Sequence, residues 1–120
     1  MNKAFKFRLY PNNDQRILIH KTFGCVRFVY NRMLGERMEH YEQTHERLRN
    51  TPAGYKQEFE WLKEVDSLAL CNAQLNLNRA FSNFYRDKKV GFPKFKSKKS
   101  NRKSYTTNLV NKNIRLAKAI

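Results

Sequence analysis

Three features of this 120-residue sequence predict an α+β fold. Residues 3–10 alternate between apolar and polar side chains with the period of a half-buried strand. Residues 12–86 carry apolar side chains at three- and four-residue steps, which is typical of amphipathic helices. Residues 104–117 return to alternation around a short turn and indicate a hairpin. Because 40% of the residues are hydrophobic, the chain has enough apolar material for a core.

The charge distribution indicates a polyanionic partner. The chain has 25 Lys and Arg against 10 Asp and Glu, a formal net charge of +15, and the acidic residues gather between Glu36 and Asp66. We therefore expect the two basic ends to form one phosphate-facing surface. Two isolated cysteines, Cys25 and Cys71, indicate buried free thiols in a reducing compartment. Since no signal peptide or membrane span is recognisable, a cytoplasmic location is expected, with the nucleoid as its place when bound.

The first elements are a strand and a helix. The strand over residues 3–10 presents a basic, aromatic face that includes Lys6 and Arg8, and it ends at Pro11. Asn12 and Gln15 have the spacing of a capping box and predict a helix N-terminus. The side chains expected to point inward from this helix are Ile17, Leu18 and Phe23.

A second helix is predicted from Cys25 to Thr44, hinged to the first at Gly24. Its apolar stripe is formed by Val26, Val29, Tyr30, Met33, Met38 and Tyr41. Two helices joined in this way fit a DNA-binding helix-turn-helix, in which Arg27 and Asn31 would reach bases or phosphates. A plain helical hairpin with solvent-facing polar side chains fits the same pattern. Of the two alternatives, the residues alone favour the plain hairpin.

Two further helices are predicted after a polar turn. Thr51 and Pro52 open a short one, and Ser67, preceded by Asp66, caps a long one that ends near Arg86. Its apolar stripe is formed by Leu70, Ala73, Leu77, Phe81 and Phe84, widened by Leu68, Cys71 and Leu75. The opposite face carries amides and Arg79, which suit base edges or solvent equally well.

A basic stretch follows from Arg86 to Lys103, with nine basic residues against one acid. Lys and Arg neutralise phosphates, and aromatic rings stack on unpaired bases. A solvated loop or a localisation tract has a similar composition, but the turn residues Gly91 and Pro93 favour a nucleic-acid-binding loop. The contacts expected in and after this stretch are Phe92, Lys94, Lys96, Lys98, Lys99 and Tyr105, next to Arg79 and Arg86.

Catalytic signatures are not recognisable in the sequence. The three histidines are isolated, and the cysteines form no Cys-x-x-Cys pair. A phosphate-binding loop, a nucleophile elbow and a pair of metal-binding carboxylates are also missing. We therefore expect no catalytic centre, no cofactor and no metal in these residues.

Six segments carry a family resemblance: KAFKFRLYPN (3–12), TFGCVRFVYN (22–31), WLKEVDSLAL (61–70), RAFSNF (79–84), KVGFPKFK (89–96) and SYTT (104–107). In this order and spacing they resemble the N-terminal part of the TnpB (OrfB) proteins of bacterial insertion sequences. These proteins are known as transposases and act as RNA-guided DNA nucleases ancestral to the type V CRISPR effectors.

The resemblance implies that residues 1–10 and 88–120 belong to a partial wedge-type, oligonucleotide-binding-like β-barrel, with residues 11–87 inserted as a helical recognition lobe. Such a lobe holds a structured guide RNA and reads a short motif beside a duplex DNA target. Carried over by position, the motif contacts are Ser67, Cys71, Asn72 and Asn111. The RNA and phosphate contacts are Lys6, Arg8, Arg27, Lys94, Lys96, Lys98, Lys99 and Tyr105.

The family's catalytic acids and zinc ribbon lie beyond the last residue of this sequence. The resemblance therefore implies a chain that binds guide RNA and DNA without cutting, as a truncated copy, a split-gene fragment with a separately encoded nuclease half, or a retained binding half. A helix-turn-helix DNA-binding protein or repressor derived from an insertion sequence is the alternative. A third hypothesis is a pseudogene product that does not fold stably.

Overall fold

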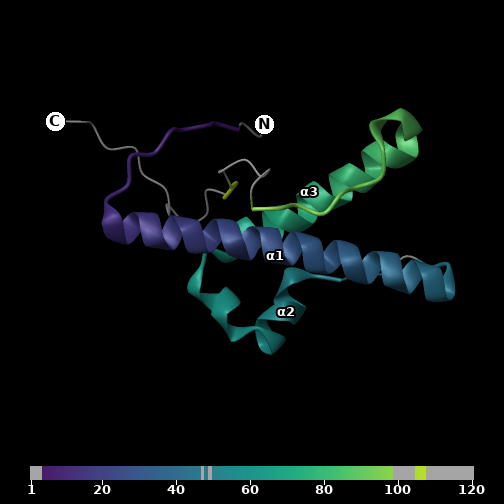
Figure 1. The fold of residues 1–120 in the computed structure, drawn as a ribbon, viewed down its shortest axis with the longest axis horizontal. Helices are drawn as coiled ribbons and strands as arrows, with labels where there is room; N and C mark the ends of the chain where they lie inside the picture. Colours follow the sequence, from purple (N-terminus) through teal and green to yellow (C-terminus); the bar gives the residue numbers. More distant parts are fainter. Residues whose placement is uncertain (1–3, 47, 49, 99–104, 108–120) are drawn as a thin grey trace.

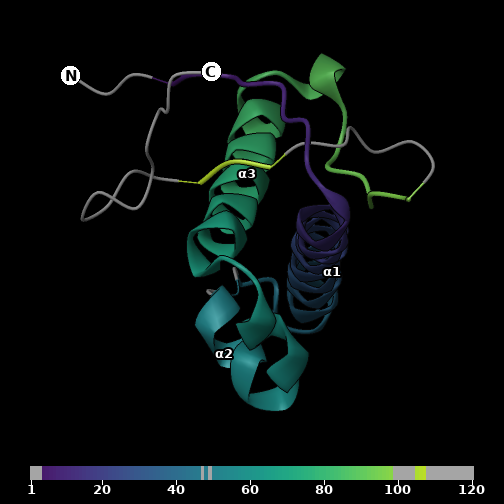
Figure 2. The same ribbon diagram turned by 90° about the vertical axis from the view of Figure 1, so that its left-hand side faces the viewer.

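The computed structural model describes residues 4–46, 48, 50–98 and 105–107. Its helices, in chain order, are α1 (Asn13–Thr44), α2 (Pro52–Glu58), the 3-10 helix η1 (Glu60–Glu64), α3 (Ser67–Arg86) and the 3-10 helix η2 (Lys88–Val90). Helix α1 is the longest element, with α3 packed along it and α2 and η1 against another side (Figures 1 and 2). Within these residues, no helix is long and apolar enough to cross a membrane.

The described residues form a helical fold, so the predicted α+β fold and barrel are wrong for this part of the chain. Residues 4–10, predicted to be the first strand, belong to no strand, and Phe5, Phe7 and Leu9 are all more than 60% exposed. A strand needs a neighbouring backbone for its hydrogen bonds, and no described segment pairs with these residues. The predicted C-terminal hairpin lies outside the described residues apart from 105–107, which are not a strand either.

Helix α1 begins as predicted. The Gln15 backbone N–H donates to Asn12 Oδ1 at 2.9 Å, and the Asn12 N–H donates to Gln15 Oε1 at 3.0 Å, which completes the capping box. The predicted hinge at Gly24 is wrong, because α1 continues through it to Thr44. One glycine costs a helix only about 1 kcal/mol, and the residues on both sides of it, Thr22 and Cys25, are buried.

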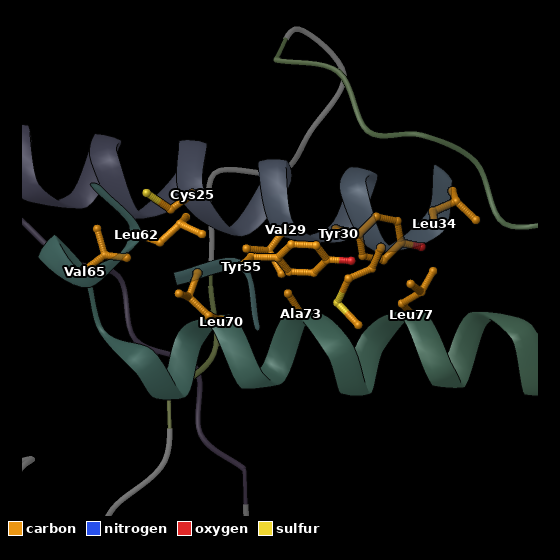
Figure 3. Close-up of a cluster of buried hydrophobic side chains, with 11 residues drawn as sticks. Cys25, Val29, Tyr30, Leu34, Tyr55, Leu62, Val65, Leu70, Ala73 and Leu77 are labelled. Atoms are coloured by element: carbon orange, nitrogen blue, oxygen red, sulfur yellow. The ribbon is translucent and has the colours of Figure 1, made fainter. Parts of the chain in front are cut away.

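Helices α1 and α3 run in the same direction and enclose the core. Figure 3 shows Cys25 near Val65 and Leu70 at one end, and Leu34 near Leu77 at the other. The fully buried large side chains are Val29, Met33, Leu34, Leu62, Leu70 and Leu77. The predicted stripe of α3 is confirmed for its buried members Leu70, Ala73 and Leu77.

Several side chains predicted to be buried are exposed. Ile17 and Leu18 are 59% and 50% exposed, because burial along α1 begins only at Thr22. Leu75 and Cys71 on α3 are also exposed, so the stripe is narrower than predicted and one of the two free thiols is at the surface. Burial raises the pKa of the other thiol, Cys25.

A polar network joins the three α-helices at Asn50. The Asn50 side chain accepts a hydrogen bond from Arg37 Nε at 2.8 Å and donates to the Tyr55 hydroxyl at 3.0 Å and to the Met33 carbonyl at 3.3 Å. Arg37 also donates to Asn78 of α3 at 2.8 Å, and the Tyr55 hydroxyl donates to Glu36 of α1. Burial and the Glu36 hydrogen bond raise the pKa of Tyr55, while burial lowers that of Arg37.

Candidate nucleic-acid interface

The basic loop, residues 88–98, returns from the end of α3 to lie beside α1 (Figure 2). Asn31 of α1 fixes it there, because its Nδ2 donates to the Lys96 carbonyl and its Oδ1 accepts from the Lys96 N–H, both at 2.8 Å. The Lys96 ammonium lies 4.5 Å from the centroid of the Tyr30 ring. Burial there lowers the pKa of Lys96. The helix-turn-helix hypothesis has Asn31 reaching bases or phosphates; in the structure its amide is bonded to the backbone of this loop.

The start of the basic loop packs on the end of α3. Phe92 meets the rings of Phe81 and Phe84 edge-on, with centroids 5.5 and 5.3 Å apart. The Lys88 ammonium lies 4.5 Å from the Phe84 centroid, within the range of a cation–π interaction. Phe92 remains 42% exposed, so part of its ring is left for a ligand.

Most cations of this region are exposed, and none of them forms an ion pair with a described acidic side chain. In the residues that the structure describes, ion pairs involve two basic side chains, Lys21 and Arg32, and both lie outside the basic loop. The exposed cations on the loop and the adjoining end of α3 are Arg79, Arg86, Lys88, Lys89, Lys94 and Lys98. Such a surface attracts phosphates, because their counterions are released on binding.

The start of α3 is tied to residues 105–107. Asp66 is the N-cap of α3, accepting from the Leu68 N–H at 3.0 Å, so the helix begins at Ser67 rather than being capped by it. The same carboxylate accepts a hydrogen bond from the Thr107 hydroxyl. Tyr105 packs edge-on against Phe23 of α1, with ring centroids 5.9 Å apart. Burial, with Asp66 as the smaller cause, raises the pKa of Tyr105.

The remaining predicted contacts are spread along the chain. Ser67 is exposed at the first turn of α3, and Asn72 donates to the Leu68 carbonyl one turn earlier at 2.9 Å. Arg27 is half-buried in the middle of α1. Lys6 and Arg8 are exposed in residues 4–10, and the Arg8 guanidinium lies 6.0 Å from the centroid of the Tyr10 ring. Lys99 and Asn111 lie outside the described residues.

Sequence reasoning misses two groups near the interface. The apolar stripe places Tyr30 in the core, and it is 5% exposed, yet its ring also supports the Lys96 ammonium. His20 packs on Phe23 next to Tyr105, with the His20 and Phe23 ring centroids 5.9 Å apart. A single histidine that belongs to no motif gives no sequence signal for that position. The described residues bring together no three His, Cys, Asp or Glu side chains as a metal site requires, and the expectation of no cofactor stays a prediction.

These observations define a small helical domain whose longest helix carries an anchored basic loop. Residues 1–46 match a family model described as a helix-turn-helix domain, that of the OrfB proteins of IS605-type elements. The chain is 34% identical over 111 residues to a putative RNA-guided DNA endonuclease of Streptomyces pristinaespiralis, covering 87% of this chain and 27% of that protein. It is 33% identical over 106 residues to the putative RNA-guided DNA endonuclease InsQ of Escherichia coli K12, covering 82% and 26%.

The chain belongs to the OrfB (TnpB) family, as the sequence resemblance predicts, and matches the N-terminal part of its members. It spans about a quarter of the length of the two endonuclease relatives. It is also 34% identical over 113 residues to virulence protein VsdF of Salmonella dublin, a match that covers 82% of this chain and 95% of VsdF. The single helix α1 runs without a break through most of the matched region, residues 1–46. A separate recognition helix starting at Cys25 is therefore not formed.

Proposed function

We propose that this chain binds structured guide RNA and duplex DNA, as the binding part of an OrfB-type RNA-guided endonuclease. The proposal rests on the exposed cations of the basic loop, which form no ion pairs among the described residues. The loop that carries them is fixed to the folded core through Asn31. The names of the endonuclease relatives support the same assignment. These 120 residues alone are expected to leave DNA intact when Mg²⁺ is added.

Fluorescence anisotropy with a labelled hairpin RNA and a labelled duplex DNA tests the proposal. We expect dissociation constants of about micromolar or below for both ligands at low salt. Both affinities should fall steeply between about 50 and 200 mM salt, because several phosphates are neutralised. Binding that is flat with salt would contradict phosphate recognition. Binding to duplex DNA alone would remove the RNA from the proposal and leave a DNA-binding protein.

The double substitution K94A/K98A is expected to weaken RNA binding and to reduce the slope of log K against log salt by about 1.4, since each single-strand phosphate that is no longer neutralised accounts for about 0.7. The matched control is K56A/K63A, which removes two charges from α2 and η1, outside the basic loop. Equal effects in the two double variants would show that only total charge matters and that the loop has no special role.

Lys96 is expected to behave differently from Lys94. Its ammonium lies against the Tyr30 ring, whereas the Lys94 side chain is exposed. K96M should therefore leave the salt slope of RNA binding unchanged, and K94M should reduce it by about 0.7, the value of one phosphate contact. Anisotropy titrations at several salt concentrations measure both. A reduced slope in K96M would place its ammonium on a phosphate in the complex.

A further inference from the structure

We infer that Asn31 is a positioning residue, whose side-chain amide fixes the basic loop on α1 so that Lys94 and Lys98 are held ready for phosphates. The inference rests on the proposed function for its effect on binding. Asn31 acts through the loop in this arrangement, because its Nδ2 and Oδ1 both bond to the Lys96 backbone.

The two hydrogen bonds use both backbone groups of one residue. Donation to the Lys96 carbonyl and acceptance from its N–H, both at 2.8 Å, reproduce the exchange between directly paired residues in an antiparallel sheet. Asn31 thus gives this segment the partner that a neighbouring strand would otherwise supply. The residues it connects are 65 positions apart in the sequence, so the contact closes the loop onto the core.

Neighbouring positions on α1 support the same placement. Tyr30 holds the Lys96 ammonium, with 4.5 Å between the ammonium and the ring centroid. A Cβ added at Gly35 would lie 3.8 Å from the Phe95 ring, so the loop passes close to the helix there. Residues 95 and 96 are therefore held on α1, while Lys94 and Lys98 on either side are exposed.

Holding a loop in its bound conformation increases affinity, because less conformational entropy is lost on binding. Releasing residues 91–98 from α1 would not change the number of cations in the loop, but it would make the distances between them variable. The expected signature is a weaker affinity with an unchanged salt slope, since the number of phosphates contacted stays the same. A residue that contacts phosphate through a charge would change both.

The test compares N31A and N31D with the control N76A in the full chain. Asn76 is an exposed amide on α3. Aspartate keeps the acceptor for the Lys96 N–H but cannot donate to its carbonyl when ionised. Two quantities are measured: the rate of trypsin cleavage after Lys94 and Lys98, which reports on anchoring alone, and RNA affinity with its salt slope.

We expect N31A to be cleaved about tenfold faster and to bind RNA about tenfold more weakly, because two hydrogen bonds of modest net strength are removed. N31D should fall between N31A and the unchanged chain, and N76A should match the unchanged chain. Circular dichroism melting checks folding, and N31D carries the same comparison should N31A not fold.

Unchanged cleavage in N31A would overturn the anchoring role. Faster cleavage with unchanged affinity would overturn the positioning role. Weaker affinity with unchanged cleavage would make Asn31 a direct contact and overturn the inference as well. Failure of the unchanged chain to bind RNA or DNA would instead refute the proposed function, while the trypsin comparison would still decide whether the amide holds the loop.

Discussion

Leu77→Ala is expected to lower the free energy of unfolding by about 2–5 kcal/mol. Leu77 is fully buried between α3 and α1, near Leu34 (Figure 3). Truncating the side chain to a methyl group loses the free energy gained by burying the removed carbon atoms. It also leaves a cavity that the two packed helices close only in part. Urea denaturation followed by the circular dichroism signal of the helices measures the change.

Leu75→Ala is the matched control, because it makes the same change two residues away on the same helix. Leu75 is 54% exposed, so its truncation should change the free energy of unfolding by no more than about 0.5 kcal/mol. A cooperative transition in the unchanged chain would also exclude the hypothesis of a product that does not fold. Equal effects in the two variants would mean that α3 presents a different face to α1.

Local signals predict the helix starts well, because a cap depends on a few neighbouring residues. Asn12 and Gln15 set the start of α1, and Pro52 sets the start of α2. The predicted hinge at Gly24 is wrong for a reason that the local sequence does not contain. A glycine raises the free energy of one helical residue, whereas burial of the residues around it against α3 and η1 stabilises the whole helix.

The alternating residues 4–10 show a second limit of the sequence. Alternation tells which side chains would share a face of a strand, but a strand forms only where another backbone pairs with it. In the described part of the chain these residues have no such partner, and Phe5 is 72% exposed. The sheet assigned to this pattern is therefore wrong, because the alternation carries no information about a pairing strand.

The candidate interface is predictable in composition and not in arrangement. The density of Lys and Arg between Arg86 and Lys103 predicts a phosphate-binding stretch, and phosphate binding there stays a prediction. The attachment of Lys96 to Asn31 spans 65 positions and has no sequence signal. An asparagine beside an apolar stripe looks the same whether its amide meets a base, water or a backbone, so only the fold assigns its role.

Asn50→Ala is expected to lower the free energy of unfolding by about 1–3 kcal/mol, the cost of leaving partly buried polar groups without partners. Its side chain holds Arg37, the Tyr55 hydroxyl and the Met33 carbonyl at one junction. Alanine keeps the backbone carbonyl that accepts from Gln74 at 3.3 Å, so the change isolates the side-chain amide. Urea denaturation measures the difference.

Asn76→Ala is the control for this prediction as well, because it removes an exposed amide and should cost no more than about 0.5 kcal/mol. A double-mutant cycle of N50A with R37A separates the network from the single residue. Since Arg37 Nε donates to Asn50 Oδ1 at 2.8 Å, the two effects should be non-additive by about 0.5–3 kcal/mol. Additive effects would show that Asn50 and Arg37 stabilise α1 and α3 independently, and that the junction is not one cooperative unit.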